Sequence, residues 1–314
     1  MVESLSSAFA VRSEMGPIDV VVVTRNSEKT VDRCLNSLKN SDVPTRALII
    51  VDGASEDNTL GVVKQIFPEA KILRETVGLA YARYLGVQSV STPTFMFLDS
   101  DSCLPSGKFY AKLASRLRNG VGAVEAFGTN IYRARFQARM RERQRFVADT
   151  QLDCRRHRAH TCCTLIRTEL LKDWVPPTGV DAGEDVLIGR HITGKGYKWL
   201  IANDVEFYHE PVSSNRLIPF GETKHALWHG RGCSRIGFYR TKDAFKILAH
   251  TFTQTLDAVR LRCPEVIPSI FFTNLGLVLG ILIYAASSLL KKADAQTCKT
   301  SPRGKTSWLG GAIV

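Results

Sequence analysis

The stretch FMFLDSDSCLP, residues 95–105, places two aspartates directly after an apolar run. The apolar run is typical of a buried strand, and the residues after it are typical of a turn. Because side chains alternate along an extended backbone, Asp99 and Asp101 are expected on the same side of it. Two such carboxylates repel each other, which predicts a cation or a basic partner nearby. An ordinary turn is the alternative interpretation.

The sequence before this stretch alternates strand-like and helix-like segments. The run IDVVVV at residues 18–23 is typical of a strand buried on both faces, and similar runs follow at 47–53, 70–75 and 94–98. Between these runs, residues 28–40, 59–67 and 78–90 carry apolar side chains at helical spacing. The alternation predicts an α/β fold with a mostly parallel sheet flanked by helices.

Polar residues follow three of the predicted strands. They are TRN at 24–26, DGAS at 52–55 and DSD at 99–101. In sheets of this kind, ligands bind outside the carboxyl ends of the strands, so the polar groups are expected to converge at one edge. The chain has neither a G-x-G-x-x-G after its first strand nor a G-x-x-x-x-G-K-[ST], so a dinucleotide fingerprint and a P-loop are not supported.

With these motifs the chain resembles glycosyltransferase family 2, whose members have the GT-A nucleotide-sugar-binding fold. The resemblance covers about residues 18–210 and rests on an ordered series of segments: VTRN, TVDRCLNSL, VDGASEDNT, GLAYARYLG, FLDSD and AGEDVLIGRHITGKGY. It implies an inverting transfer of a sugar from a nucleotide diphosphate sugar such as GDP-mannose or a UDP-hexose. The Gln-x-x-Arg-Trp motif of processive members is absent, which favours addition of one sugar per encounter.

The resemblance also implies the residues that bind the donor. The nucleotide sugar would be bound by Thr24, Arg25, Asn26, Asp52, Arg83, Asp99 and Ser100. The metal would be bound by Asp99, Asp101 and His209. Carboxylate oxygens suit Mg²⁺ or Mn²⁺, and such an ion would relieve the repulsion between the paired aspartates. Tyr84 replaces the Asn that the family has after the arginine at position 83.

Two acids in AGEDVLIGR are the candidates for proton transfer. Glu184 and Asp185 are expected on the first turn of a helix, where the helix dipole favours ionised acids. A capping role is therefore an alternative, above all for Glu184. The family match implies that Asp185 is the general base that accepts the proton of the acceptor hydroxyl.

The net charge of +12 implies an anionic partner. Arginines at 133, 135, 139, 141, 143 and 145 are interleaved with Phe136, Met140 and Phe146, and a second cluster, RRHR, stands at 155–158. A solvated helix face or an RNA-binding stretch is the alternative. Beside a membrane anchor, a lipid phosphate is favoured over nucleic acid, and we assign acceptor binding to Arg141, Arg143, Arg145 and Arg231.

Residues 266–290 contain no charged side chain and are long enough to cross a bilayer. The predicted organisation is a flexible tail at 1–16, a GT-A domain at 17–211, amphipathic interfacial helices at 212–262, a transmembrane anchor at 263–292 and a tail at 293–314. Because nucleotide sugars are cytosolic, the catalytic domain is expected on the cytosolic side. The cysteines lack paired C-x-x-C spacing, so no metal–thiolate site is predicted.

The leading hypothesis is a metal-dependent, membrane-anchored hexosyltransferase with a lipid-linked acceptor, polyprenyl phosphate first among the candidates. A neutral glycolipid or glycan acceptor is the alternative within the same class. A non-enzymatic basic membrane adaptor with a nucleotide pocket is the alternative of another class, but an adaptor needs no set of three acids such as Asp99, Asp101 and Asp185. A nucleotidyltransferase is disfavoured because its Gly-rich, Lys-containing loop is missing.

Overall fold

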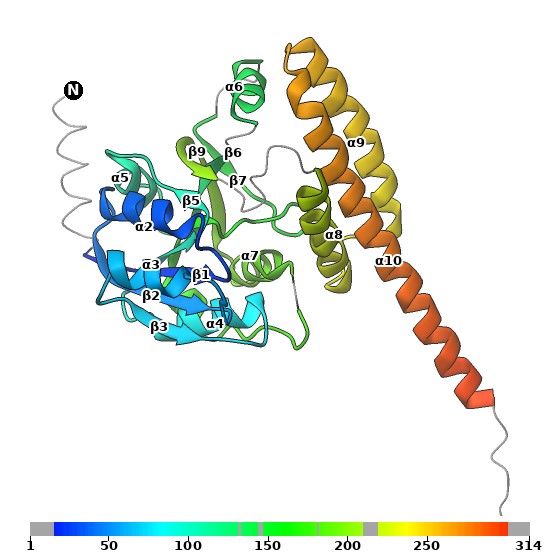
Figure 1. The fold of residues 1–314 in the computed structure, drawn as a ribbon, viewed down its shortest axis with the longest axis horizontal. Coiled ribbons are helices and arrows are strands. Elements are labelled where there is room, and N and C mark those ends of the chain that lie inside the picture. The colour runs from blue at the N-terminus through cyan, green and yellow to red at the C-terminus, as the bar shows by residue number, and fades with distance from the viewer. Residues whose placement is uncertain (1–15, 131–132, 144–146, 181, 210–218, 301–314) are drawn as a thin grey trace, which may run out of the picture.

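The computed structural model describes residues 16–130, 133–143, 147–180, 182–209 and 219–300 (Figure 1). These residues form one mixed nine-stranded sheet in the order β3-β2-β1-β4-β8-β6-β9-β5, with β7 paired to β9. The strands are β1 Ile18–Thr24, β2 Thr45–Asp52, β3 Lys71–Arg74, β4 Thr94–Asp99, β5 Ser102–Cys103, β6 Val121–Asn130, β7 Asp149–Gln151, β8 Cys163–Arg167 and β9 Lys198–His209.

Helices flank this sheet and extend beyond it. They are α2 Val31–Lys39, α3 Thr59–Ile66, α4 Leu79–Ser89, α5 Phe109–Ala114, α6 Ala134–Arg143, α7 Glu184–Gly194, α8 Pro219–Arg235, α9 Thr241–Arg260 and α10 Ile267–Thr300. The predicted α/β architecture with flanking helices and further helices after the sheet is confirmed. The sheet is mixed rather than mostly parallel, because β5, β7 and β8 run antiparallel to their neighbours.

The first half of the sheet is parallel, as the alternation of strands and helices predicts. Strand β1 lies between β2 and β4, and all three run in the same direction. In this register Thr24 pairs with Asp52, and Val23 pairs with Asp99. The carboxyl ends of the three strands therefore meet at one edge, where the polar residues converge.

The second half of the sheet introduces antiparallel strands. Strand β8 runs antiparallel to both β4 and β6, whereas β6 and β9 are parallel. The register places Cys163 opposite Leu98, at the end of β4. The start of β8, more than 60 positions later in the chain, thereby lies directly beside the end of β4 and the turn that follows Asp99.

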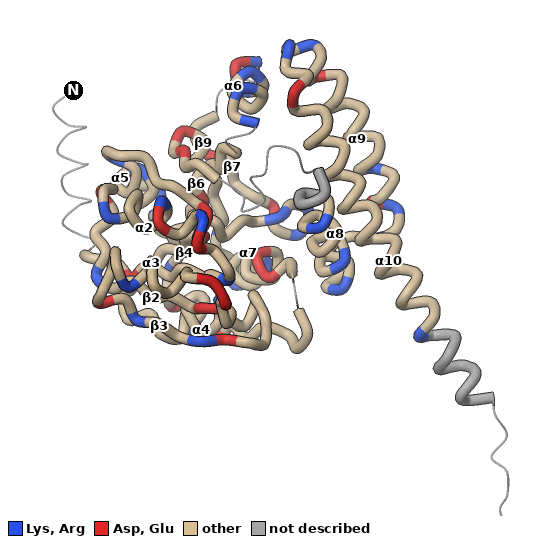
Figure 2. Tube along the Cα trace, in the orientation of Figure 1, with Lys and Arg blue, Asp and Glu red and all other residues tan. Residues whose placement is uncertain are grey.

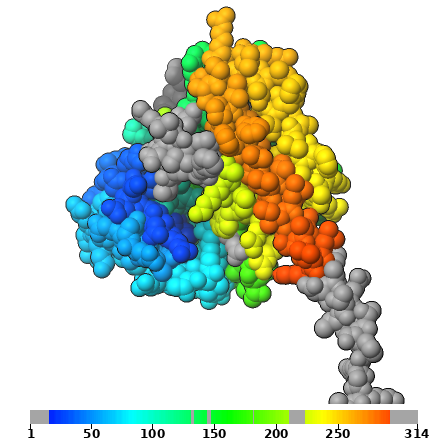
Figure 3. Space-filling view, turned by 45° about the vertical axis from the view of Figure 1, so that its right-hand side comes forward, coloured from blue at the N-terminus to red at the C-terminus, as the bar shows by residue number. Residues whose placement is uncertain are grey.

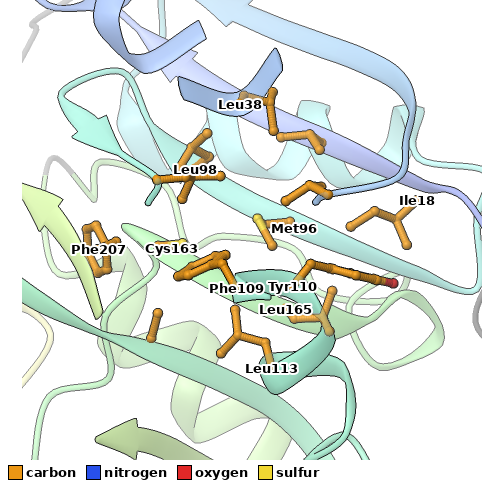
Figure 4. Packing of buried hydrophobic residues seen from close by; sticks show 14 of the residues in the cluster. Ile18, Leu38, Met96, Leu98, Phe109, Tyr110, Leu113, Cys163, Leu165 and Phe207 are labelled. Atoms are coloured by element: carbon orange, nitrogen blue, oxygen red, sulfur yellow. The ribbon is translucent and has the colours of Figure 1, made fainter. Parts of the chain in front are cut away.

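Two hydrophobic clusters cover the two faces of the sheet. On one face, β1 and β4 pack against α2, α3 and α5; Figure 4 shows Leu38, Met96, Leu98, Phe109 and Cys163 in this cluster. On the other face, Phe95, Phe97 and Trp199 pack against α4 and α7. Because β1 and β4 are buried on both faces, their sequences are nearly continuous runs of apolar residues.

Helices α8, α9 and α10 lie side by side along one flank of the part of the chain that contains the sheet (Figures 1 and 3). Gly276 and Gly280 permit close packing, because a Cβ at these positions would lie 2.4 Å from the Thr223 carbonyl oxygen and 2.3 Å from the Leu227 carbonyl oxygen of α8. Within the described residues one helical segment, Pro264–Lys291, is long and apolar enough to cross a membrane. Helix α10 continues to Thr300, past the predicted end of the anchor, and the N-terminal tail up to residue 15 lies outside the described residues.

Candidate active site

A buried arginine joins two acids at the carboxyl edge of the sheet. Arg83, on α4, places its Nη2 atom 2.8 Å from Oδ1 of Asp99 and its Nε atom 3.2 Å from Oε1 of Glu184. The Arg83 side chain is only 3% exposed. Burial opposes the ionisation of Asp99, but the positive charge of Arg83 outweighs it and lowers the pKa of that carboxyl. Arg83 therefore fixes the end of β4 to the start of α7.

Glu184 and Asp185 begin α7, as the sequence predicts, but their carboxylates differ in environment. Burial and repulsion from Asp185 raise the pKa of the Glu184 carboxyl, and its Oε2 atom has no partner among the described residues. Asp185 lies 2.6 Å from Nε of Arg158 through its Oδ2 atom. The arginine holds the Asp185 carboxylate in one orientation.

Arg158 is a site residue that the sequence did not single out. It belongs to the RRHR cluster, which was interpreted as a binding stretch for anions. In the structure, its Nη2 atom also lies 3.5 Å from Nε2 of His229 on α8. Burial works against the charge of Arg158, but Asp185 outweighs it and raises the pKa of the guanidinium. The RRHR cluster is the only sequence signal that points to Arg158. Its pairing with Asp185 could not be predicted, because the two residues are 27 positions apart in the chain.

Asp99 and Asp101 are brought together by a turn and a histidine. The expectation that an extended backbone places both on one side is wrong, because β4 ends at Asp99 and residues 100–101 form a turn. Nε2 of His209, at the end of β9, lies 3.2 Å from Oδ1 of Asp101. Burial opposes the charged imidazole, but the hydrogen bond to Asp101 prevails and raises the pKa of His209.

The thiol of Cys162 lies beside Asp99 and His209. Donor atoms of Asp99, Cys162 and His209 all lie within 4.8 Å of one another, and each of the three residues is partly buried. Burial and the neighbouring Asp99 raise the pKa of the Cys162 thiol well above its usual range. The cysteine spacing in the sequence did not reveal this position, since Cys162 reaches the site only through the pairing of β8 with β4.

The predicted nucleoside-binding residues lie at the carboxyl ends of β1 and β2 and on the loops that follow β1 and β4. Thr24 is buried, and its hydroxyl has no partner among the described residues, whereas Arg25 and Asn26 are exposed. Both carboxylate oxygens of Asp52 accept hydrogen bonds from Ser55. Ser100 is buried and lies 2.9 Å from the hydroxyl of Ser27. Their roles in donor binding stay predictions.

Two of the predicted acceptor arginines, Arg141 and Arg143, belong to α6. Figure 2 shows basic residues gathered on α6, beside the turn between α9 and α10. Arg141 forms an ion pair with Glu206 and lies 3.7 Å above the ring of Phe127. Arg143 and, on α8, Arg231 are exposed, whereas Arg145 lies outside the described residues. Arg133 donates to Ser269 and Thr273 of α10, so α6 is fastened to the apolar helix.

Glu125, on β6, is a buried acid that the sequence analysis did not select. Its Oε2 atom accepts hydrogen bonds from the His160 amide at 3.0 Å and from Nε1 of Trp199 at 2.9 Å. Burial nevertheless raises the pKa of this carboxyl to about 7. Its contribution to stability is therefore fully present below the unfolded pKa near 4.5 and is lost as the pH rises through about 7.

We predict that Glu125→Gln removes this pH dependence, because a glutamine carbonyl retains both hydrogen bonds and does not ionise. As the pH rises from about 4.5 to about 7, the free energy of unfolding of the wild type should fall relative to that of the variant by up to about 3 kcal/mol. Urea unfolding between about pH 5 and pH 8 measures the difference. Glu69→Gln, at an exposed position near the start of β3, is the control. Parallel pH curves for wild type and Glu125→Gln would contradict the prediction.

The sequence model of glycosyl transferase family 2 matches residues 19–175, half of the chain. The chain therefore belongs to this family. Its fold is shared by TarS of S. aureus (residues 1–349; 17% identity, TM-score 0.50, covering 87% of this chain and 91% of TarS). It is also shared by the mannosyltransferase PcManGT of Pyrobaculum calidifontis, solved in complex with GDP-Man and Mn²⁺ (17% identity, TM-score 0.51, covering 94% and 88%).

Curated relatives match a shorter region. The teichoic acid poly(glycerol phosphate) polymerase of Staphylococcus epidermidis is 29% identical over 123 residues, which is 37% of this chain and 17% of the polymerase. The SPbeta prophage-derived glycosyltransferase SunS of Bacillus subtilis is 26% identical over 103 residues, 32% of this chain and 24% of SunS. The similarity to each relative is thus confined to a fraction of its length.

Proposed function

We propose that the chain transfers a sugar from a nucleotide diphosphate sugar, with inversion, to a lipid-linked acceptor at a membrane. The observation that carries this proposal is the convergence of Asp99, Asp101 and His209 with the buried acid Asp185 at the carboxyl edge of the sheet. Ligands bind at this edge in parallel α/β sheets. Membership of glycosyl transferase family 2 supports the same reaction class.

The donor atoms at this edge fit a divalent cation. Two carboxylates and an imidazole suit Mn²⁺, and the carboxylates suit Mg²⁺. When bound, the ion would neutralise negative charge on the departing nucleotide diphosphate. The buried Nη1 atom of Arg83 and the hydroxyl of Thr24 lack partners among the described residues, so both have hydrogen-bonding capacity left for the donor.

Asp185 supplies the base in this proposal. The oxygen of an acceptor hydroxyl forms a bond to the anomeric carbon, the bond from that carbon to the diphosphate oxygen breaks, and the hydroxyl proton moves to the Asp185 carboxylate. Arg158 orients this carboxylate at 2.6 Å. Hydrogen-bonded groups held in one orientation need little rearrangement during proton transfer.

We predict that Asp101→Ala weakens metal-dependent binding of a nucleotide diphosphate. The substitution removes one carboxylate and the partner of His209, so affinity should fall by about 10–100-fold or more. Titration calorimetry with UDP and GDP, with Mn²⁺ and then with a chelator, measures the effect. Glu69→Ala is the control, because this acid lies at the opposite edge of the sheet. Unchanged affinity in Asp101→Ala, or indifference of the wild type to the chelator, would refute the metal assignment.

Two features support a membrane location. Pro264–Lys291 has the length and composition of a spanning helix. Helix α9 exposes a stripe of apolar side chains at helical spacing: Phe245, Leu248, Phe252, Leu256 and Val259. In this proposal the stripe contacts lipid, the anchor lies at 263–292, and the catalytic domain lies on the cytosolic side, where nucleotide sugars occur.

The acceptor has two candidates that differ in chemistry. The arginines beside α10 favour a polyprenyl phosphate, but Arg141 is already paired with Glu206, and the exposed Arg135 lies 3.7 Å from Glu265. Arg143 is therefore the exposed arginine of α6 that forms no ion pair among the described residues. A base at Asp185 favours a hydroxyl on a glycolipid or glycan, because a phosphate oxygen carries no proton that must be removed at neutral pH.

We predict that Arg143→Glu raises the KM for polyprenyl phosphate by about tenfold if this arginine binds the acceptor. Donor affinity should stay unchanged. The assay uses detergent-solubilised enzyme, so that docking on lipid surfaces plays no part, and it scores release of the nucleotide diphosphate. Arg155→Glu, a charge reversal at an exposed arginine in the other cluster, is the matched control. If detergent kinetics stay the same while binding to anionic vesicles weakens, α6 is a membrane contact and the phosphate assignment is wrong.

A further inference from the structure

The pairing of β8 with β4 places a sulfur atom at the candidate metal site. Cys162 directly precedes β8, and the amide of Asp99 donates a hydrogen bond to the Cys162 carbonyl oxygen at 2.8 Å. The neighbouring Cys163 is fully buried and contributes to the hydrophobic cluster shown in Figure 4. Cys162 is only partly buried, packs against the edge of the same cluster, and has its sulfur within 4.8 Å of donor atoms of Asp99 and His209.

The distances suit a single ion. The carboxylate of Asp99, the sulfur of Cys162 and a ring nitrogen of His209 come from β4, the start of β8 and the end of β9, and they lie within 4.8 Å of one another. Ligands on opposite sides of one ion are separated by about twice the metal–ligand distance of ~2.0–2.3 Å. Small side-chain movements therefore bring all three donors to one centre. Asp101, 3.2 Å from His209 through its Oδ1 atom, stands next to this centre.

We propose that Cys162 is a ligand of the divalent cation, together with Asp99 and His209, which makes the centre a mixed oxygen, nitrogen and sulfur site. This inference rests on the metal site of the proposed function and specifies its ligands. Thiolate and imidazole ligands favour Zn²⁺, Co²⁺ and Cd²⁺, whereas oxygen ligands alone favour Mg²⁺. The site therefore selects transition-metal ions over Mg²⁺. On binding, the sulfur–proton bond is exchanged for a sulfur–metal bond and the proton passes to solvent.

The test uses the full chain in detergent with Co²⁺ alone, in the absence of nucleotide. A cobalt–thiolate bond produces a charge-transfer absorption band in the near ultraviolet, which carboxylate and imidazole ligands do not produce. The wild type should show this band, and Cys162→Ser should lose it. Cys103→Ser is the matched control, because Cys103 is another partly buried cysteine near this edge of the sheet; its variant should retain the band.

Titration calorimetry adds a measure of selectivity. Cys162→Ser should weaken Cd²⁺ binding by about 10–100-fold while changing Mg²⁺ affinity much less, since serine preserves the size of the side chain and removes only the soft ligand. Equal losses for the two ions, a wild type without the band, or a band that persists in Cys162→Ser would each overturn the proposal.

A measurement on the unmodified chain covers the case in which the variant does not fold. Bound Cd²⁺ should protect Cys162 from alkylation and leave the reaction of Cys103 unchanged, as read by peptide mass spectrometry. Alkylation of Cys162 at the same rate with and without Cd²⁺ would also overturn the proposal. None of these measurements involves sugar transfer. A negative result would therefore overturn the assignment of Cys162 as a ligand without contradicting the proposed reaction. Conversely, the cobalt band can be measured even if the enzyme shows no sugar transfer.

Discussion

Asp185→Asn is expected to bind the nucleotide sugar with normal affinity and to transfer the sugar about 10²–10⁴-fold more slowly. The substitution keeps the shape of the side chain and removes only its capacity to accept a proton. Asp185 is buried at the start of α7, its Oδ1 atom accepts the Val186 amide, and its Oδ2 atom faces Arg158. An asparagine oxygen retains one of these contacts, so the fold should persist.

The measurement combines donor calorimetry with single-turnover rates. Asp173→Asn is the control, since this exposed acid pairs with His191 and Lys195 near the far end of α7. Circular dichroism confirms that each variant is folded. Near-normal turnover of folded Asp185→Asn with a hydroxyl acceptor would place the base elsewhere. Normal turnover restricted to a phosphate acceptor would identify a reaction that needs no base.

Arg83→Met is expected to destabilise the fold by about 3–5 kcal/mol, which is the usual cost of removing one partner from a buried ion pair. Arg83 is 3% exposed and lies between Asp99 and Glu184; the Glu184 side chain is 4% exposed. Without the guanidinium, Glu184 would be left with its charge buried and uncompensated, or it would have to take up a proton. Methionine retains much of the apolar stem, so little of the loss should come from packing.

Denaturant unfolding measures this cost, and a second substitution isolates its origin. Arg83→Met combined with Glu184→Gln should recover part of the lost stability, because the unpaired acid is then neutral. Arg116→Met is the matched control: Arg116 also contacts two aspartates, Asp149 and Asp204, but these are 40% and 32% exposed, and such pairs contribute about 1 kcal/mol or less each. If Arg83→Met costs no more than Arg116→Met, the bridge does not stabilise the site.

The sequence by itself determined the parallel half of the fold. Runs of β-branched residues identify strands buried on both faces, and helical spacing between them requires crossover connections. Those local patterns place Thr24, Asp52 and Asp99 at the ends of neighbouring strands, because parallel strands of one sheet end at the same edge. The position of the two acids at the start of α7 was also predictable, because the start of a helix has a local sequence signal. The family motifs add the order in which these segments follow one another.

Only the tertiary structure decided which distant residues meet. Strand β8 pairs antiparallel with β4, and no local pattern predicts its partner; this pairing brings Cys162 to Asp99. The turn at residues 100–101 replaced the expected extended backbone, and His209 rather than strand geometry joins the acids. Arg158 and Glu125 meet their partners across 27 and 74 positions, and Arg141 turns to Glu206 instead of remaining free. Side-chain pairing depends on the three-dimensional path of the chain, whereas hydrophobic periodicity reports only which face of each segment is buried.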